Sequence, residues 1–596
     1  MRPRSPKTSQ KCSRMTARPD SMANALARGS RLSILEATRS AARSPFGRAA
    51  RLALLLLWAG PLAAQQAVRV RSATAPDPHT DPILAAMHEE ITRSKAQLKM
   101  ENVPAPYYIE YRLADLEEFR AEAAFGAIRE NQRIHARTIR VVVRVGDYQQ
   151  DSYFGPGIGV FDLGPLESDP VALRHQLWHA TDVAYKNASE ALAAKRATMR
   201  QFASGQPFDD FAHESPTRSI GPLAKLDFDA ASWTDLLQKS TELFRTDPKL
   251  ESLSASASFQ CVNQYFVNTE GTVTRHGYTL YMLTVAGETQ ADDGMRLDRS
   301  PYYVAASVRE LPSAKQVLDD TAKMLSTLKA LREAPVVEED YRGPVLFSPD
   351  ASTDIFNAMI GDNVLGRRPK PGDSSRTTGD FAASYKSPVL PTFLSVVDDP
   401  TMKSFQGKTL IGAYDYDDEG VPGAKVPVIE DGVLVNYLLG REPIRDFPVS
   451  NGHGRGAPGQ PTSPAIGNLI VEVKRPVSRD ALKQKLLEIC RQEGKSYGYY
   501  VETLAGYNPR LLYRVYTDDG HQELVRGAVF DELDTRTLRH DLVAAGNDLL
   551  VSNRESVVPS TVIAPSFLLD ELEVKRTDEK NAKLPEYSPP PLGSKP

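Results

Sequence analysis

Apolar residues recur at two spacings in the first half of this chain, and each spacing predicts a different element. Recurrence every three to four residues predicts amphipathic helices, while alternation of apolar and polar residues predicts strands. The expected helices cover residues 82–100, 171–202, 232–245 and 313–332. The expected strands cover residues 107–113, 121–129, 138–145, 253–267, 278–285 and 302–308. Asn268-Thr269-Glu270-Gly271 is a turn signal after the fourth of these strands.

Strands dominate the second half of the chain. A helix is expected after Ser348, and two more over residues 479–491 and 535–545. The expected strands cover residues 392–397, 409–416, 425–430, 433–439, 468–474, 499–504, 511–516, 522–530 and 567–574. Because the strands follow one another in groups and do not alternate with helices, the sequence predicts an α+β protein of two domains, with antiparallel sheets flanked by helices.

The segment Glu333-Ala334-Pro335 predicts a linker between the two domains. We expect an N-terminal α+β domain over residues 65–335 and a strand-rich C-terminal domain over residues 340–576. Residues 577–596 include Pro589-Pro590-Pro591 and are expected to be a disordered tail.

Charge is unevenly placed along the 596 residues, whose net charge is −4. Residues 1–51 hold twelve Lys and Arg against Asp20 and Glu36, a net of +10, which leaves −14 for the rest of the chain. An acidic body argues against a nucleic-acid ligand.

The N-terminal residues 1–64 have the pattern of an extension that ends in a signal peptide. Basic residues precede a short apolar run, and small residues follow a Gly-Pro break, which places the signal at about residues 48–64. We therefore expect export to the periplasm or the extracellular space. Membrane anchoring is the weaker alternative, because the apolar run is short for a bilayer span.

Cysteine is scarce in the expected mature chain, where only Cys261 and Cys490 remain. Cys261 lies in an alternating run and Cys490 on an amphipathic helix. We expect two buried free thiols in preference to a disulfide.

Histidines with metal-ligand spacing are incomplete as motifs. His175 and His179 could share one helix face, but no glutamate stands where a peptidase base is needed, so a surface role is favoured. His88-Glu89 and His213-Glu214 begin like zinc motifs, and neither completes HExxH or HExxxH.

Carboxylates gather around a predicted hairpin. Such groups can act as acid and base or hold a hard cation, although their spacing does not match a calcium loop. The sequence favours a solvated face that caps turns. The cluster consists of Asp398, Asp399, Asp415, Asp417, Asp418 and Glu419.

Residues 451–459 form a glycine-rich stretch with His453 and Arg455 as hydrogen-bond donors. It lacks the Lys-Ser/Thr pair of a phosphate-binding loop. Two interpretations stay open, which are a loop that borders a ligand cleft and an irregular connection.

Several short motifs, taken in their order along the chain, resemble those of the TldD/PmbA family. They are Phe266-Val267-Asn268-Thr269-Glu270-Gly271-Thr272, Tyr341-Arg342-Gly343-Pro344-Val345-Leu346-Phe347, Asp398-Asp399-Pro400, Asp417-Asp418-Glu419-Gly420-Val421-Pro422, Ile429-Glu430-Asp431-Gly432-Val433-Leu434, Tyr437-Leu438 and Asn451-Gly452. The resemblance covers most of residues 80–575. It implies a relationship to metal-dependent peptidases that act on peptides and unfolded chains.

The resemblance also implies where metal ligands would stand. TldD-like subunits carry His-Glu-x-x-x-His on a helix and a cysteine ligand near the C-terminus, and they pair with a PmbA-like (TldE) subunit that lacks the motif. The motif positions fall on Asn357, Ala358 and Asp362, and residues 551–564 contain no cysteine. Zinc requires imidazole, thiolate or carboxylate ligands, so this placement predicts neither a metal centre nor catalytic residues.

Three functions follow from these observations. The leading hypothesis is an exported, non-catalytic TldE-like subunit without cofactor, which binds peptide or unfolded polypeptide and forms a homo- or heterodimer with a TldD/PmbA-family subunit. Its candidate peptide contacts are Asp398, Asp399, Asn451, His453 and Arg455. The alternatives are an active metallopeptidase whose zinc is held by His453 with Asp398, Asp399 or Asp362, and a structural exported protein without a ligand.

Overall fold

The computed structural model describes residues 81–167, 169–201, 208–370, 372–578 and 582–592. These residues belong to one compact unit that begins at Ser72. The expected extension and signal peptide, residues 1–64, lie outside the described residues. No helix in the described part of the chain is long and apolar enough to cross a membrane.

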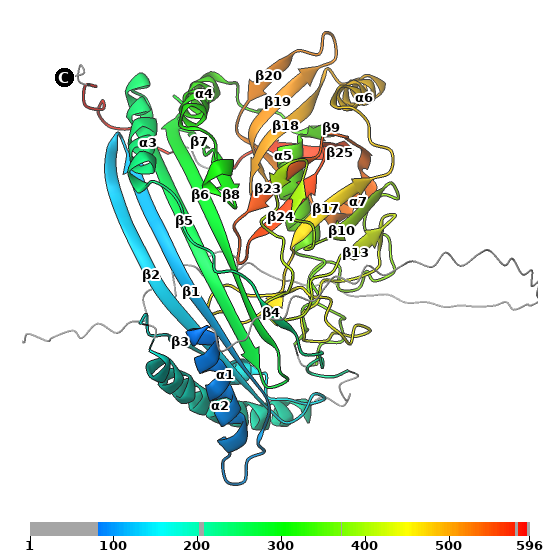
Figure 1. The fold of residues 1–596 in the computed structure, drawn as a ribbon. Coiled ribbons are helices and arrows are strands. Elements are labelled where there is room, and N and C mark those ends of the chain that lie inside the picture. The colour runs from blue at the N-terminus through cyan, green and yellow to red at the C-terminus, as the bar shows by residue number, and fades with distance from the viewer. Residues whose placement is uncertain (1–80, 168, 202–207, 371, 579–581, 593–596) are drawn as a thin grey trace, which may run out of the picture. The chain divides into compact units, whose positions relative to one another are not determined.

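Two long antiparallel hairpins dominate the N-terminal half (Figure 1). They belong to an eight-stranded sheet in the order β3-β2-β1-β5-β6-β4, with β7 and β8 also paired to β6. The strands are β1 (Pro106–Ala124), β2 (Ala127–Val145), β3 (Val160–Leu163), β4 (Arg218–Ile220), β5 (Leu250–Asn268), β6 (Val273–Gln290), β7 (Arg296–Arg299) and β8 (Tyr302–Ala305).

The turns of the two hairpins differ in how well the sequence predicts them. Asn268 caps the predicted turn, because its Oδ1 accepts the backbone N–H groups of Glu270, Gly271 and Thr272, each at 3.0 Å. The expected strand over residues 121–129 is wrong, since it runs across the turn between β1 and β2. Phe125 has a φ of 50° there, a conformation that a bulky residue seldom adopts, so its sequence gives little sign of the turn.

Helices cover the two ends of this sheet (Figure 1). Near one end lie α1 (Pro82–Gln97) and α2 (Pro170–Met199), whose apolar faces share a core with β1 and β2. Near the other lie α3 (Ala230–Glu242) and α4 (Ala314–Glu333), which share a core with β5 and β6. Each helix begins at a side chain that caps its first turn, namely Asp81, Asp169, Asp229 and Ser313.

Two sheets and a buried helix build the C-terminal half. The six-stranded sheet has the order β14-β13-β10-β17-β24-β23, and the seven-stranded sheet has the order β20-β19-β18-β9-β25-β21, with β22 also paired to β25. The strands are β9 (Tyr341–Phe347), β10 (Leu394–Asp398), β13 (Val426–Glu430), β14 (Val433–Leu434), β17 (Asn468–Val473), β18 (Tyr497–Ala505), β19 (Asn508–Tyr516), β20 (Gln522–Val525), β21 (Ala528–Asp531), β22 (Leu542–Ala545), β23 (Leu550–Arg554), β24 (Ser560–Ala564) and β25 (Phe567–Arg576).

Helix α5 (Pro349–Phe356) contributes to the core shared by these sheets, while α6 (Arg479–Gln492) and α7 (Thr535–His540) flank the seven-stranded sheet. The α+β prediction is confirmed. Most pairs are antiparallel, as expected, but β4 with β6, β17 with β24 and β9 with β18 are parallel. Cys261 on β5 and Cys490 on α6 are both buried and free.

Four expected elements in this half are wrong in extent. The strand over residues 522–530 divides at Gly527, where φ is 75°, into β20 and β21, which pair with β19 and β25 respectively. The strand over residues 409–416 shrinks to β12 (Lys408–Thr409), paired with β11 (Ser404–Phe405), and the rest forms turns around the acidic cluster. The strand over residues 433–439 ends at Leu434. The helix over residues 535–545 ends at His540, because the chain then pairs as β22 with β25.

Candidate functional site

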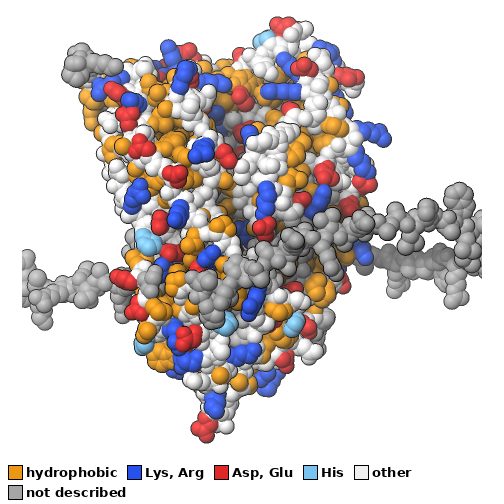
Figure 2. Space-filling model, in the orientation of Figure 1, with side chains coloured by type: hydrophobic (Ala, Val, Ile, Leu, Met, Phe, Trp, Pro, Cys, Tyr) orange, Lys and Arg blue, Asp and Glu red, His pale blue; other side chains and the backbone are white. Residues whose placement is uncertain are grey.

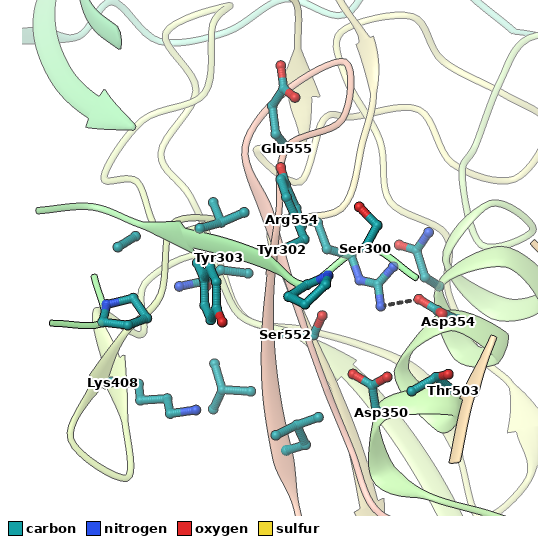
Figure 3. A pocket seen from close by; sticks show the side chains of 18 of the residues that line it. Ser300, Tyr302, Tyr303, Asp350, Asp354, Lys408, Thr503, Ser552, Arg554 and Glu555 are labelled. Carbon is teal, nitrogen blue, oxygen red and sulfur yellow. Dashed lines mark hydrogen bonds and ion pairs between the residues drawn. The ribbon is translucent and has the colours of Figure 1, made fainter. Parts of the chain in front are cut away.

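A cavity of about 1020 Å³ opens between segments that are far apart in the sequence. The N-terminal half contributes β7, β8 and the short helix at Val308–Glu310, and the C-terminal half contributes α5, the β11–β12 hairpin and β23. Figure 3 shows the polar side chains that several of these segments direct toward it, among them Asp350, Asp354, Lys408 and Ser552. The volume suits a segment of polypeptide or another extended ligand.

Helix α5 provides one wall of this cavity. Ser348 caps it by accepting the N–H of Ala351 at 3.1 Å, and Pro349 occupies the first turn, where its missing N–H costs nothing. Asp350, Asp354 and Asn357 line the cavity. Their spacing of four and then three residues places them along one helix face.

The end of α5 widens into a π-helical turn over Asn357–Gly361. The N–H of Asp362 donates to the carbonyl of Asn357, five residues earlier, at 3.2 Å. Such turns are rare and often occur at functional sites, and their hydrogen bonds link residues five apart. The motif implied by the family resemblance has the same spacing, and here the two positions hold Asn357 and Asp362.

Strand β23 forms another wall, and it is the edge strand of the six-stranded sheet. Its residues pair with β24 on one side, and no strand among the described residues pairs with the other side. Arg554 at its end is tied to α5, with Nη2 2.6 Å from Asp354 Oδ1 and 2.8 Å from Thr353 Oγ1. The Nε of Arg554 is buried without a hydrogen-bond partner in the described structure.

Charged groups in the cavity fall into paired and unpaired sets. Arg554 pairs with Asp354, and Arg510 Nη1 lies 3.1 Å from Asp298 Oδ1. Within the described residues, no ion pair or side-chain hydrogen bond holds Asp350, Glu555 or Lys408, which are exposed at the cavity. Arg299 also lines the cavity without an ion pair to the described residues, and its Nη1 donates to Thr503 Oγ1 at 2.6 Å. Partial burial and the negative charge of Asp354 raise the pKa of Asp350, while Arg554 and Arg299 oppose the shift, and partial burial likewise raises the pKa of Glu555.

The residues at the motif positions do not fit a zinc centre. Asn357 is a weak neutral donor, Ala358 offers no ligand atom, and Asp362 is exposed and absent from the cavity lining. Among the described residues, one group of three or more histidine, cysteine or acidic side chains lies close enough to share an ion. That group is Asp518, Asp519 and His521 on an exposed turn between β19 and β20, outside this cavity.

The candidate contacts from the glycine-rich loop lie elsewhere and are paired internally. His453 Nε2 lies 3.0 Å from Asp398 Oδ1, and both side chains are fully buried. Asn451, half-buried, accepts the N–H of Leu439 and donates to the carbonyl of Tyr437. The Arg455 guanidinium lies 3.3 Å from Asp418, so none of these side chains lines the large cavity.

The acidic cluster is buried, which corrects the expected solvated face. Asp398, Asp399, Asp417, Asp418 and Glu419 are each at most 8% exposed, and within the cluster only Asp415 lies on the surface. Asp417 accepts the N–H groups of Glu419, Val421 and Gly454. Burial raises the pKa of Asp417 well above its usual range, with Glu419 adding repulsion. The carboxylates therefore organise the loops between strands.

One side chain joins this cluster to the N-terminal half. The Arg441 guanidinium lies 2.7 and 2.8 Å from the two carboxylate oxygens of Glu270 and donates to the carbonyl of Ala212 at 2.6 Å. Its backbone N–H donates to Glu419 Oε2 at 2.7 Å. Arg441 is 1% exposed and its guanidinium lies over the ring of Phe211. The turn after β5 is thereby fixed to the C-terminal half.

Sequence reasoning missed the cavity residues Asp350, Asp354, Lys408, Ser552, Arg554 and Glu555. The spacing of Asp350, Asp354 and Asn357 along the helix after Ser348 was a usable signal. The position of β23 at the edge of its sheet depends on the order of the strands, which the sequence of one strand does not reveal. The pair His175 and His179 lies exposed on α2, where the described residues supply no third ligand.

Comparisons with known proteins agree with the motifs. The family described as the PmbA/TldA metallopeptidase C-terminal domain matches residues 340–576. A stretch of 50 residues is 44% identical to a metalloprotease of Methanocaldococcus jannaschii, which covers 8% of this chain and 10% of that protein.

Two solved structures share the fold. A proposed modulator of DNA gyrase from Thermotoga maritima superposes with a TM-score of 0.55 at 15% identity, over 82% of this chain and 99% of the other. TldE from Thermococcus kodakarensis superposes with a TM-score of 0.53 at 13% identity, over 82% and 99%. Residues 340–576 therefore form a C-terminal domain of the PmbA/TldA metallopeptidase family, and the chain shares its fold with these two solved structures.

Proposed function

We propose that this protein is a peptide-binding, non-catalytic member of its family, which takes an extended polypeptide into the large cavity without a metal centre. The observation that carries the proposal is the combination of two walls. One is the π-turn at Asn357, where the donor set does not suit zinc, and the other is the unpaired edge of β23. A site with an open strand edge and no metal ligands favours binding over hydrolysis.

Strand addition is the binding mode that this geometry supports. An extended peptide pairs with the free backbone groups of β23, which provides affinity that is independent of sequence. The cavity volume of about 1020 Å³ leaves room for side chains on both sides of the added strand.

Partnership and location belong to the same proposal. A subunit that binds unfolded polypeptide without cleaving it could deliver that polypeptide to a catalytic subunit of the same family. We therefore propose a dimer with a TldD/PmbA-family subunit, either a second copy or a metal-binding homologue. The signal peptide expected at about residues 48–64 supports a location outside the cytoplasm as part of this proposal.

Backbone-methylated peptides test strand addition directly. A fluorescent decapeptide without charged residues is offered to the purified mature chain, and binding is measured by anisotropy with and without added Zn²⁺. Two further peptides carry N-methyl groups on alternate residues, one in each register. One register blocks the hydrogen bonds to β23 and is expected to weaken binding by about tenfold or more, since several bonds of roughly 1 kcal/mol each are lost. The other register leaves those bonds intact.

A protein variant locates the binding site. Ser552→Phe fills the cavity from β23 and is expected to weaken binding, while Ser326→Phe on the exposed face of α4 is the matched control. Equal loss in both methylated registers, or no effect of Ser552→Phe, would contradict strand addition at β23. Cleavage of the peptide that depends on Zn²⁺ and stops on chelation would instead support the metallopeptidase alternative.

A further inference from the structure

A second cavity, of about 30 Å³, lies beneath the glycine-rich loop. Its floor is one face of the eight-stranded sheet, from β2 across β1 and β5 to β6, and its roof is the loop segment 456–460. It shares no lining residue with the large cavity. Its volume holds about two water-sized groups, so any ligand of this cavity has to be small.

Two arginines stand side by side in the floor. Arg112 on β1 and Arg140 on β2 lie directly opposite each other in the strand register, and both line the cavity. Like charges at opposite positions of neighbouring strands destabilise a sheet. Burial lowers the pKa of Arg140, and the positive charge of Arg112 adds to the shift, while Glu110 opposes it.

Arg140 has no acidic partner among the described residues. Its guanidinium donates to two neutral acceptors, the carbonyl oxygens of Gly459 at 3.2 Å and Ile158 at 2.5 Å. The residue is only 5% exposed. A buried cation without a counter-ion is costly, so this arrangement favours a negative charge in the cavity.

Arg112 has donor capacity to spare. Its Nε lies 3.3 Å from Glu110 Oε1, and its side chain makes no hydrogen bond to the described residues. The roof passes close to its other end, because a Cβ atom on Gly456 would lie 3.3 Å from Arg112 Nη1. The glycine therefore leaves space above this donor.

The two carboxylates around the cavity already have partners. Glu110 pairs with Arg112, and Asp418, at the β6 side of the cavity, lies 3.3 Å from Arg455 and 3.8 Å from His276. Partial burial lowers the pKa of His276, so its imidazole carries no charge near pH 7. Three arginines therefore face two carboxylates around this cavity, an excess of one positive charge.

A general surface field does not attract anions to this protein. Figure 2 shows acidic and basic side chains interspersed over the face that it presents, and the net charge of the chain is −4. Asp415, which also acts on His276, is exposed and lies 2.5 Å from Lys403. Affinity for an anion therefore has to arise inside the cavity, where a charge interacts more strongly than on the surface.

We propose that this cavity binds a small monovalent anion, a halide or a single carboxylate group, between Arg112 and Arg140. The anion supplies the negative charge that Arg140 lacks and accepts a hydrogen bond from Arg112 Nη1. Gln264 on β5 and Thr274 on β6 line the same floor and offer further donors. Because Arg140 also holds the carbonyl of Gly459, the bound anion fixes the glycine-rich loop to the N-terminal sheet.

Thermal denaturation at constant ionic strength tests this inference without any peptide, so its result does not depend on the proposed function. Sodium chloride or sodium acetate replaces sodium gluconate stepwise, since gluconate has the same charge on an anion too large for the cavity. At about a hundredfold above Kd the midpoint is expected to have risen by about 2 °C and to have levelled off. A rise with chloride alone assigns a halide site, and a rise with acetate assigns a carboxylate site.

Variants assign the effect to the two arginines. In Arg112→Gln the rise is expected to vanish, and Arg133→Gln, at an exposed position of β2, is the matched control and should keep it. Diffraction from wild-type crystals grown with the stabilising anion should show that anion between Arg112 and Arg140, which decides the matter even if Arg112→Gln does not fold. No rise with either salt, a rise that survives in Arg112→Gln, or an anion bound only elsewhere would overturn the inference.

Discussion

His453 and Asp398 form a fully buried pair in which the imidazole Nε2 lies 3.0 Å from the carboxylate. The other ring nitrogen, Nδ1, lies 3.0 Å from the carbonyl oxygen of Asn451. Both ring nitrogens therefore lie within hydrogen-bonding distance of an oxygen atom. The pair fixes the glycine-rich loop to the end of β10.

Removal of this histidine should be costly to stability. His453→Ala leaves Asp398 buried without its partner, and we expect the free energy of unfolding to fall by about 3 kcal/mol, measured by urea denaturation. His521→Ala is the control, since His521 is exposed beside Asp519 on a turn, and it should leave the transition midpoint near that of the wild type. Equal effects of the two substitutions would contradict a structural role for the buried pair.

Arg441 should be irreplaceable by lysine. Its planar guanidinium bonds both oxygens of Glu270 and the carbonyl of Ala212, which a single ammonium cannot reproduce. We expect Arg441→Lys to lose about 2 kcal/mol and Arg441→Met about 4 kcal/mol of unfolding free energy. Thermal denaturation of both variants measures this, with Arg342→Lys on the surface as the control. A lysine variant as stable as the wild type would show that charge alone suffices.

Stability should fall as pH rises through neutrality because of Glu442. Burial raises the pKa of this carboxyl to about 7, with Arg144 opposing the shift. A group whose pKa is higher in the folded state binds its proton more tightly there. Its contribution is therefore complete below about pH 4.5, the ordinary value, and is lost as the pH passes about 7.

The variant Glu442→Gln isolates this contribution. Between about pH 5 and pH 8 the wild type should lose up to about 3 kcal/mol more than Glu442→Gln, measured by urea denaturation at each pH. Glu333→Gln at the exposed end of α4 should follow the wild-type curve. Parallel curves for wild type and Glu442→Gln would show that this carboxyl does not titrate in the neutral range.

Two histidines introduced into the π-helical turn should bind Zn²⁺ together. A backbone hydrogen bond links Asn357 to Asp362, five residues later, so Asn357→His combined with Asp362→His places two imidazoles one π-helical turn apart. We expect this variant to bind Zn²⁺ more tightly than the wild type in calorimetric titration. Asn357→His combined with Ala358→His is the control, because adjacent helical residues do not face each other. Equal zinc affinity of the two double variants would show that the turn does not align its side chains.

Local signals in the sequence were sufficient for most elements. Helix caps and turns involve only neighbouring residues, so a short stretch of sequence is enough to predict them. Examples are the caps at Asp81 and Ser348 and the turn at Asn268. The β1–β2 turn was missed, because Phe125 tolerates a positive φ only where tertiary contacts hold it. The acidic cluster was misjudged for a similar reason.

Burial of a carboxylate depends on partners that sequence distance conceals. Asp398 pairs with His453, which lies 55 residues further along the chain. Asp418 pairs with Arg455, which lies 37 residues further along. Only the folded arrangement of strands brings these groups together, and their pairing offsets the free-energy cost of removing the carboxylates from water. The cavity is a stronger case, since its walls come from both halves of the chain and none of its charged residues was predicted.

The unpaired edge of β23 can promote aggregation of the protein as well as the proposed binding of a peptide. The unpaired backbone groups of β23 can form hydrogen bonds with a bound peptide. They can form the same bonds with a strand from an unfolded copy of this chain. During synthesis at high concentration, self-association through this edge competes with correct maturation. An occupant that fills the cavity early would therefore act as a folding aid for the protein itself.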